Sequence, residues 1–246
     1  MSWYKHWFAD ELYMDLYAHR DAAEARQAID LFERVTGTIS GGSRSPLLDL
    51  ACGTGRHAFE LARRGYTVMA ADLSPTLLSA AARKTQRYRD RLSLVRADMR
   101  RLPFGACFAA VLQLFTAFGY FRTDAANEAV VAGVRAVLPT DGWYMLDFLN
   151  AADVARTLEA RTEQHTAHGR VVQERAIRNG RVEKRIRISG DGREEEFTES
   201  VRLYTLADFN GMFSRNGFAM AEVFGSYEGA VFRDTSPRCI MFARTV

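Results

Sequence analysis

The amino-acid sequence predicts an α/β fold in which a doubly wound, mostly parallel sheet lies between two layers of helices. From Pro46 onward, short apolar runs alternate with segments of helical periodicity. This alternation is typical of βαβ units, which place parallel strands side by side and helices on both faces of the sheet. The chain has 246 residues, of which 48% are hydrophobic. It is therefore long and apolar enough to bury a substantial core.

The elements of this region can be placed in order. Buried strands are expected at residues 47–51, 67–71, 92–97, 109–115 and 143–148. Helices are expected at residues 56–64, from Ser74 onward, at about residues 124–138 and, ahead of the region, at residues 21–35. Ser74 followed by Pro75 is a strong start signal, because Ser caps a helix and Pro suits its first turn.

Residues 162–204 break the strand–helix rhythm. Asn179-Gly180 and Asp191-Gly192 lie between segments that alternate apolar and polar residues, a pattern typical of β-hairpins. We therefore expect an antiparallel β insertion here. Beyond it, Thr205 as N-cap with Asp208 three residues later predicts a helix, and residues 220–224 and 239–243 predict two closing strands.

Composition excludes several classes of protein. Thirty-three basic and 30 acidic residues give a net charge of +3, which does not demand a nucleic-acid partner. The three cysteines form no CxxC pair, so a disulfide framework or a cysteine zinc site is not expected. The longest apolar run, residues 106–112, is too short to span a bilayer, and the N-terminus does not resemble a signal peptide. We expect a cytoplasmic protein without a membrane partner.

The most informative stretch is LLDLACGTGRH at residues 47–57, a buried strand that ends in a glycine turn before a helix. Gly53 and Gly55 would let the backbone approach a ligand closely at the helix N-terminus. Ala58 occupies the place of the third glycine of a dinucleotide fingerprint, and no Gly-Lys-Ser/Thr follows. The turn therefore predicts a ligand site that is neither of the usual dinucleotide type nor a P-loop.

Three acidic residues accompany the predicted strands. Asp49 lies within the first strand, near enough to orient the turn or a ligand ammonium; Asp72 ends the second, and Asp98 follows the third. An acid at the position of Asp72 can accept both ribose hydroxyls of an adenosyl ligand, and Asp98 with Met99 suits adenine. Three carboxylates disfavour an anionic pyrophosphate and suit a ligand with a sulfonium and an ammonium. The charges therefore favour S-adenosylmethionine over NAD.

These motifs resemble those of the class I S-adenosylmethionine-dependent methyltransferases. LLDLACGTG is similar to their first motif, Asp72 to their acidic strand end, and Ala97-Asp98-Met99 to their third motif. The resemblance implies a Rossmann-like, seven-stranded sheet whose last strand is antiparallel, with the cofactor at the carboxyl ends of the strands. The cofactor-binding candidates of this region are Asp49, Ala51, Gly53, Gly55, His57, Asp72, Leu73, Asp98 and Met99.

A looser resemblance covers the whole chain and points to small-molecule N-methyltransferases that act on nucleotide-linked amino sugars. DLYAHR at residues 15–20 is similar to their N-terminal segment, and LFTAFGYF at residues 114–121 to the segment after their fourth strand. The resemblance implies Tyr17 and Arg20 beside the cofactor and Phe115 as a wall of the methionine pocket.

Catalytic candidates come from the same segments. Tyr17 and Tyr120 can orient the nucleophile, and His19 can act as a base for a hydroxyl acceptor, whereas an amine can lose its proton to water. The five histidines show no metal-ligand spacing, so no metal is expected. Asp147 and Asn150 are expected to cap the helix after the fifth strand rather than to bind a metal.

The sequence therefore predicts a methyltransferase that acts on a small-molecule amine or hydroxyl and releases S-adenosylhomocysteine. The alternatives are an RNA- or protein-directed methyltransferase and a non-catalytic S-adenosylmethionine-binding module. Four regions are expected: a helical lid segment (1–45), the cofactor-binding core (46–161), the β insertion (162–204) and the last helix and strands of the core (205–246). The lid should cover the methionine half of the cofactor and the insertion should form a wall of the acceptor pocket. A homodimer is possible.

Overall fold

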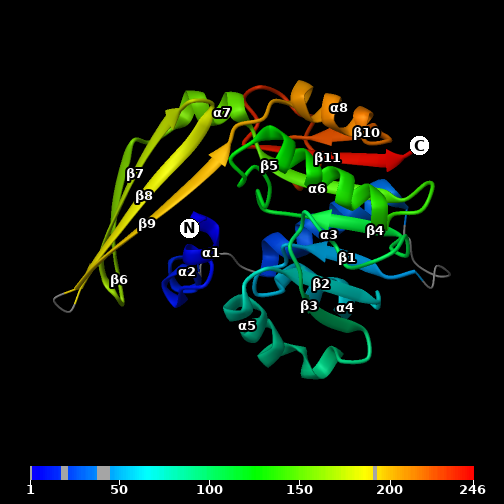
Figure 1. Ribbon diagram of the computed structural model, residues 1–246, viewed down its shortest axis with the longest axis horizontal. Coiled ribbons are helices and arrows are strands. Elements are labelled where there is room, and N and C mark those ends of the chain that lie inside the picture. The colour runs from blue at the N-terminus through cyan, green and yellow to red at the C-terminus, as the bar shows by residue number, and fades with distance from the viewer. Residues whose placement is uncertain (1, 18–21, 38–44, 191–192) are drawn as a thin grey trace.

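The computed structural model describes residues 2–17, 22–37, 45–190 and 193–246. A seven-stranded sheet with helices on both faces forms the centre, and a four-stranded antiparallel sheet extends to one side of it (Figure 1). The N-terminal helices lie between the two sheets (Figure 1). Across the described parts of the chain, no helix has both the length and the apolar character that crossing a bilayer requires.

The central sheet has the predicted topology. Its spatial order is β10 (Phe218–Phe224), β11 (Arg238–Thr245), β5 (Trp143–Leu149), β4 (Ala110–Gln113), β1 (Leu47–Leu50), β2 (Val68–Asp72) and β3 (Leu92–Arg96). The pairs from β5 to β3 are parallel, and the last strand, β11, is antiparallel to both of its neighbours. This confirms the Rossmann-like arrangement expected from the strand–helix alternation. The carboxyl ends of β4, β1, β2 and β3 meet at one edge.

Two hydrophobic layers join the helices to this sheet. The helices are α3 (Ala22–Thr36), α4 (Arg56–Arg63), α5 (Pro75–Thr85) with the short 3-10 turn η1 (Gln86–Tyr88), α6 (Asp124–Val137), α7 (Ala151–Thr157) and α8 (Leu206–Arg215). One cluster of buried side chains packs α3 and α4 on one face, and another packs α6 and α8 on the opposite face. Strand residues point alternately to the two layers, as in a sheet that is buried on both sides.

The predicted helix starts are confirmed. The Ser74 hydroxyl accepts a hydrogen bond from the Leu77 amide, and Pro75 is the first residue of α5. At α8, the Thr205 hydroxyl accepts from the Asp208 amide while the Asp208 carboxylate accepts from the Thr205 amide. This reciprocal capping box satisfies two amides that the helix itself leaves unpaired.

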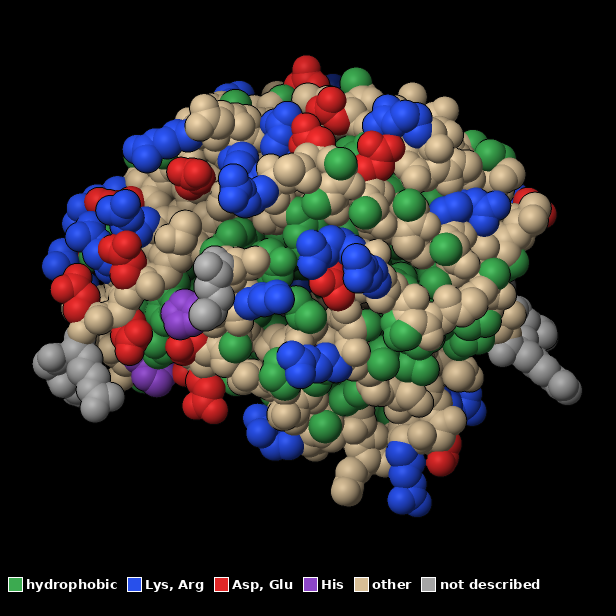
Figure 2. Space-filling view, viewed as in Figure 1, with side chains coloured by type: hydrophobic (Ala, Val, Ile, Leu, Met, Phe, Trp, Pro, Cys, Tyr) green, Lys and Arg blue, Asp and Glu red, His purple; other side chains and the backbone are tan. Residues whose placement is uncertain are grey.

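The insertion is an antiparallel sheet of β6 (Arg161–Thr166), β7 (Gly169–Arg178), β8 (Arg181–Gly190) and β9 (Arg193–Arg202), paired in chain order. Asn179 and Gly180 both have positive φ between β7 and β8, as the predicted hairpin turn requires. The second predicted turn, at residues 191–192, lies outside the described residues. Acidic and basic side chains are mixed over this sheet (Figure 2), for example in the Arg170–Glu163 and Arg187–Glu174 ion pairs.

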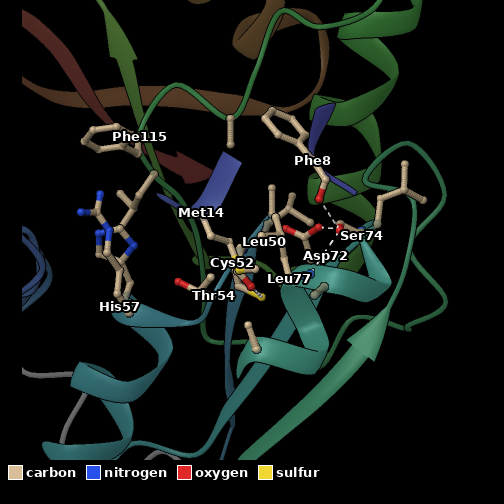
Figure 3. A pocket seen from close by; sticks show the side chains of 18 of the residues that line it. Phe8, Met14, Leu50, Cys52, Thr54, His57, Asp72, Ser74, Leu77 and Phe115 are labelled. Atoms are coloured by element: carbon tan, nitrogen blue, oxygen red, sulfur yellow. Dashed lines mark hydrogen bonds between the residues drawn. The ribbon is translucent and has the colours of Figure 1, made fainter. Parts of the chain in front are cut away.

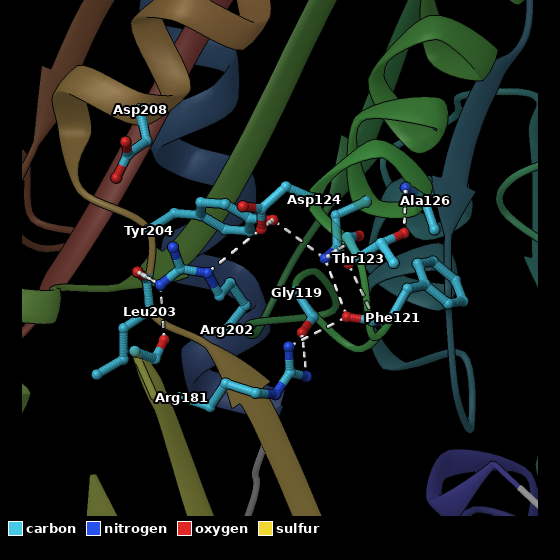
Figure 4. Close-up of polar contacts among 12 residues, drawn as sticks. Gly119, Phe121, Thr123, Asp124, Ala126, Arg181, Arg202, Leu203, Tyr204 and Asp208 are labelled. Atoms are coloured by element: carbon cyan, nitrogen blue, oxygen red, sulfur yellow. Dashed lines mark hydrogen bonds and ion pairs between the residues drawn. The ribbon is translucent and has the colours of Figure 1, made fainter. Parts of the chain in front are cut away.

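Two arginines of the insertion attach it to the loop after β4 (Figure 4). The Arg181 guanidinium donates to the carbonyl oxygens of Gly119 at 3.0 Å and Phe121 at 3.1 Å, and the Arg202 amide donates to the Gly119 carbonyl at 2.9 Å. Next to this junction, the Tyr204 hydroxyl donates to the Asp124 carboxylate at 2.6 Å. The segment that contains Tyr120 is therefore held from the insertion.

The N-terminal helices α1 (Trp3–Trp7) and α2 (Glu11–Leu16) bridge the two sheets. Trp7 and Leu16 are buried in a small hydrophobic cluster with residues of β7, β8 and β9. On the opposite side, the Ser74 hydroxyl donates to the Phe8 carbonyl at 2.6 Å and the Thr76 hydroxyl donates to the Ala9 carbonyl at 2.9 Å. The segment is thus tied both to the insertion and to the start of α5.

The loop after β4 is strained and is held by a buried ion pair. Phe115 and Thr116 have φ values of 62° and 61°, a region that side chains rarely adopt. The Asp147 carboxylate accepts from the Phe115 amide at 2.7 Å, from the Arg238 guanidinium at 2.6 Å and from the Tyr227 hydroxyl at 2.6 Å. The expectation that Asp147 caps a helix is wrong, because it lies inside β5 and turns toward this loop. Asn150 does cap α7, through the Ala152 amide.

Replacing Asp147 by Asn should lower the free energy of unfolding by about 3 kcal/mol, the lower end for breaking a buried ion pair. Asp147 is fully buried and Arg238 largely so, and the guanidinium would lose its counter-charge. Urea unfolding measures the loss. The matched control is Glu128→Gln, which removes the acid of the exposed Arg215–Glu128 pair and should cost less than about 1 kcal/mol. Equal losses in the two variants would contradict a structural role for the buried pair.

Candidate functional site

A cavity of about 870 Å³ lies at the carboxyl ends of β1, β2, β3 and β4. It is bounded by the glycine turn after β1, by one side of α4 and of α5 along their length, by η1 and by the N-terminal segment. Figure 3 shows Asp72 and Ser74 at one end, His57 and Phe115 at the other, and Cys52 and Thr54 of the turn between them. Open parallel sheets bind ligands at this edge.

Most of the site residues expected from the sequence meet at this cavity. Those that line it are Tyr17, Ala51, Gly53, His57, Asp72, Leu73, Asp98, Met99, Phe115 and Tyr120. Asp49 and Gly55 are not among the lining residues. His19 and Arg20 lie outside the described residues. Several lining residues were not expected from the sequence, among them Phe8, Met14, Thr54 and Arg56.

The glycine turn follows a path that few side chains permit. Ala51, Gly53 and Gly55 have φ values of 59°, 58° and 80°. A Cβ atom on Gly55 would lie 3.3 Å from the Phe59 ring, so this glycine also permits close packing against α4. A Cβ atom on Gly53 would meet no protein atom within 4 Å, so the backbone there borders open space at the cavity.

Asp49 supports the turn from behind. Its carboxylate accepts a hydrogen bond from the Ala58 amide in the first turn of α4 at 3.0 Å. The pKa of Asp49 is raised from 3.8 to about 7, mainly by burial and also by the nearby Asp72, while the Ala58 hydrogen bond and the Arg56 charge oppose the shift. The Asp49 side chain therefore fixes the start of α4 against β1 from a fully buried position.

Asp72 connects the turn to α5 and borders the cavity. One carboxylate oxygen accepts from the Gly53 amide and the other from the Ser74 amide, each at 2.8 Å. Burial raises the pKa of Asp72, and its hydrogen bonds from backbone amides oppose the shift. Because a carboxylate can accept about four hydrogen bonds, these two amides orient Asp72 and leave it further acceptor capacity.

Asp98 and Met99 form the neighbouring part of the wall. The Asp98 carboxylate accepts from the Arg100 guanidinium at 2.6 Å and from the Arg100 amide at 3.0 Å, and the guanidinium side-chain hydrogen bond lowers the pKa of Asp98. Arg100 in turn lies 4.3 Å from the centre of the Phe121 ring. This end of the cavity therefore presents an ionised carboxylate beside an apolar sulfur side chain.

The opposite end combines a ring, a guanidinium and an imidazole. The Arg56 guanidinium lies 4.5 Å from the centre of the Phe115 ring and pairs with Glu24 of α3 at 2.6 Å. His57 Nε2 is buried and has no hydrogen-bond partner among the described residues. Burial and then Arg56 lower the pKa of His57 to about 3, so its ring is neutral. The one sequence signal that could have identified Arg56 as a site residue is its position, since it is the first helical residue after the turn.

Aromatic side chains close the outer side of the cavity. Tyr120 stacks with Tyr4 at 6.3 Å, and Tyr17 packs against Tyr13 at 5.0 Å. A tyrosine-rich wall of this kind is both apolar and able to form hydrogen bonds. It comes from α1, α2 and the loop after β4.

The Tyr17 hydroxyl lies in a polar cluster contributed by the insertion. It donates to Glu199 at 2.6 Å and accepts from Lys184 at 2.6 Å. Glu199 also accepts from Trp7 at 2.7 Å, and Lys184 holds the pKa of Glu199 low against the opposing effect of burial. None of the described residues that line the cavity comes from residues 162–204. The expectation that the insertion forms a wall is therefore wrong: the insertion holds Tyr17 instead.

The described segments contain no group of three or more His, Cys, Asp or Glu side chains that could hold a metal ion.

Replacing Asp49 by Asn should change the free energy of unfolding, relative to the wild type at the same pH, more favourably at pH 8 than at pH 5. Because the pKa of Asp49 is about 7 when folded and 3.8 ordinarily, the folded state binds the proton more tightly than the unfolded chain. Its contribution to stability is therefore lost as the pH rises from about 4 to 7 and is constant above 7. Asn still accepts from Ala58. Urea unfolding at both pH values tests this, with exposed Asp90→Asn as the control, and a pH-independent difference for Asp49→Asn would contradict it.

Comparison with known proteins identifies a family that matches the part of the chain around this site. Residues 47–142 match the family described as methyltransferase domain. The chain is 27% identical to the dTDP-3-amino-3,4,6-trideoxy-alpha-D-glucopyranose N,N-dimethyltransferase of Streptomyces venezuelae, over 85% of this chain and 87% of that protein. It is 28% identical to the cypemycin N-terminal methyltransferase of a Streptomyces species, over 82% of this chain and 89% of that one.

A solved structure has the same fold over nearly the whole chain. It is that of S-adenosylmethionine-bound CalS10, an amino pentose methyltransferase from Micromonospora echinaspora. The TM-score is 0.71 at 23% identity, and the match covers 96% of this chain and 98% of that one. The methyltransferase match spans β1 to the start of β5, where the glycine turn, Asp72 and Asp98 lie. The chain is therefore a class I S-adenosylmethionine-dependent methyltransferase that resembles the amino-sugar N-methyltransferases.

Proposed function

We propose that this protein methylates the amine of a small molecule, with S-adenosylmethionine bound across the glycine turn. The observation that carries the proposal is the orientation of Asp72, which two backbone amides hold at the edge of the cavity. The ribose hydroxyls would bind Asp72, and adenine would lie between Leu73, Asp98 and Met99. The methionine part would pass Ala51 and Gly53 toward Phe115.

The residues present fit this cofactor. Asp72 has a raised pKa because it is buried, and a cationic ligand would favour its charged form. The backbone of Gly53 borders open space, so a ligand can approach it closely. We assign Asp49 and Gly55 to shaping the turn, because neither lines the cavity.

A small-molecule amine is favoured as acceptor by two kinds of support. The first is the similarity to the sugar N,N-dimethyltransferase, which covers most of both chains. The second is the aromatic wall of Tyr4, Tyr13, Tyr17 and Tyr120, since rings stabilise the cation that N-methylation produces. The similarity to the cypemycin N-terminal methyltransferase makes a peptide amine the second candidate. A hydroxyl acceptor would depend on His19 as base.

In the proposed mechanism, bound S-adenosylmethionine supplies a methyl group activated by positive sulfur. The protein aligns the acceptor nitrogen with this group and excludes water, and alignment alone can contribute about 7–11 kcal/mol to the barrier reduction. Tyr120, held by the Arg181 contacts to its loop, and Tyr17, held by Glu199 and Lys184, orient the acceptor. The amine proton leaves to water, so no strong base is required.

Other features of the proposal concern the chain as a whole. We assign residues 1–45 to a lid segment, 46–161 and 205–246 to the core, and 162–204 to a support for the lid. The mixed charges of the insertion disfavour an RNA acceptor, because a phosphate-binding surface is predominantly basic. We propose a cytoplasmic enzyme that can form a homodimer.

Replacing Asp72 by Asn should weaken the binding of S-adenosylhomocysteine by about 10- to 100-fold, because hydrogen bonds to a charged acceptor contribute about 1.5–3 kcal/mol each. Isothermal titration calorimetry measures the change, with Asp90→Asn as the control. NAD should not bind to either protein. Unchanged affinity in a folded Asp72→Asn variant would mean that the ribose binds elsewhere.

Methyl transfer to matched acceptors tests the reaction. With labelled S-adenosylmethionine, we expect label to be transferred to a nucleotide-linked amino sugar and none to the same sugar with a hydroxyl in place of the amine. The other acceptors to be tested are transfer RNA and peptides that have a free N-terminus. Labelling of the peptides alone would establish the second candidate, and labelling of the hydroxyl sugar or of RNA would refute an amine-specific enzyme.

A further inference from the structure

We propose that Arg56 and His57, the first two residues of α4, bind the carboxylate of the cofactor's methionine part. This inference rests on the proposed function, because it takes S-adenosylmethionine as the ligand. It assigns Arg56, which no motif of the sequence singles out.

The strand order determines which end of the cavity receives the carboxylate. The central sheet places β4 on one side of β1, and β2 and β3 on the other. Asp72 ends β2 and Asp98 follows β3, so the proposed ribose and adenine sites lie on the β2 side of the glycine turn. A ligand that crosses the turn therefore carries its amino-acid end to the β4 side, where Phe115 lies.

Arg56 places a cation at that end. Arg238 also lies over the Phe115 ring, but it pairs with Asp147 and does not line the cavity. The Arg56 side chain is 18% exposed and lines the cavity, and two contacts hold the guanidinium, with the Phe115 ring at 4.5 Å and with Glu24 through Nη1 at 2.6 Å. A guanidinium has five N–H donors in a planar fork that matches a carboxylate. The pair with Glu24 uses Nη1, so the fork can receive a second carboxylate through its other nitrogens.

His57 provides an independent indication of a ligand. Its side chain is 4% exposed, lines the cavity, and has an Nε2 atom without a hydrogen-bond partner among the described residues. A buried polar atom without a partner costs free energy that a bound acceptor restores. A neutral imidazole with its proton on Nε2 can donate to the same carboxylate as Arg56. Both residues lie in the first turn of α4, where the helix dipole also favours an anion.

A pair of ligands separates this contact from the rest of cofactor binding. S-Adenosylhomocysteine carries the carboxylate, whereas 5′-methylthioadenosine keeps the adenosyl group and the thioether but lacks the whole amino-acid end. In Arg56→Met, the affinity for S-adenosylhomocysteine should fall by about 10- to 100-fold and that for methylthioadenosine should change less than about twofold. Arg56→Lys keeps the charge without the planar fork, so its loss of affinity for S-adenosylhomocysteine should be intermediate. His57→Leu should lose less of this affinity, again with little change in the affinity for methylthioadenosine.

Two further variants serve as comparisons in the same binding measurements. Arg215→Met removes the same charge from the last residue of α8, which does not line the cavity, and should leave the ratio of the two affinities unchanged. Arg20→Met tests the arginine that the family resemblance implies. Normal binding of methylthioadenosine shows that a variant is folded. The proposal would be overturned if Arg56→Met left the ratio of the S-adenosylhomocysteine affinity to the methylthioadenosine affinity unchanged. It would also be overturned if this ratio fell in Arg20→Met but not in Arg56→Met. Failure of the wild type to bind either ligand would refute the cofactor site itself.

Discussion

The site depends on one constraint: the backbone after β1 must turn sharply at the carboxyl edge of the sheet and remain there. Three residues of the turn have positive φ, and hydrogen bonds from its neighbourhood to two carboxylates hold it in place. Asp49 fixes the helix behind the turn, and Asp72 fixes the turn itself and the start of α5. Because both acids bind backbone amides, they position the main-chain atoms that form this edge of the cavity.

The same arrangement has an electrostatic cost. Burial raises the pKa of both Asp49 and Asp72, and Asp72 also raises that of Asp49. A cationic cofactor in the cavity would offset this cost, whereas an anionic one would increase it. At the β4 side the charges are reversed, with Arg56 over the Phe115 ring. Two carboxylates, Asp72 and Asp98, therefore lie where we place the adenosyl group, and the Arg56 guanidinium lies where we place the amino-acid end.

The β insertion holds residues that line the cavity, although none of its own described residues lines it. Two side chains of β8 reach the two tyrosines that we place near the acceptor: Arg181 binds the loop that contains Tyr120, and Lys184 binds the hydroxyl of Tyr17. The N-terminal segment is then tied to α5 through Ser74. Tyrosines on a short helix and a loop would otherwise adopt many conformations, and ordering them in advance lowers the entropy that binding must supply.

Features that depend on neighbours along the chain could be predicted from the amino-acid sequence. The strand–helix alternation predicted the sheet, the cap residues predicted the start of α8 at Thr205, and the glycine turn with Asp72 marked the cavity. Contacts between side chains of distant segments could be identified only in the folded chain. Asp147 was expected to cap a helix and instead binds Arg238, 91 residues later. Glu199 was unmarked and holds Tyr17, 182 residues earlier. Local periodicity and capping cannot encode such pairs, because they arise only when packing brings the segments together.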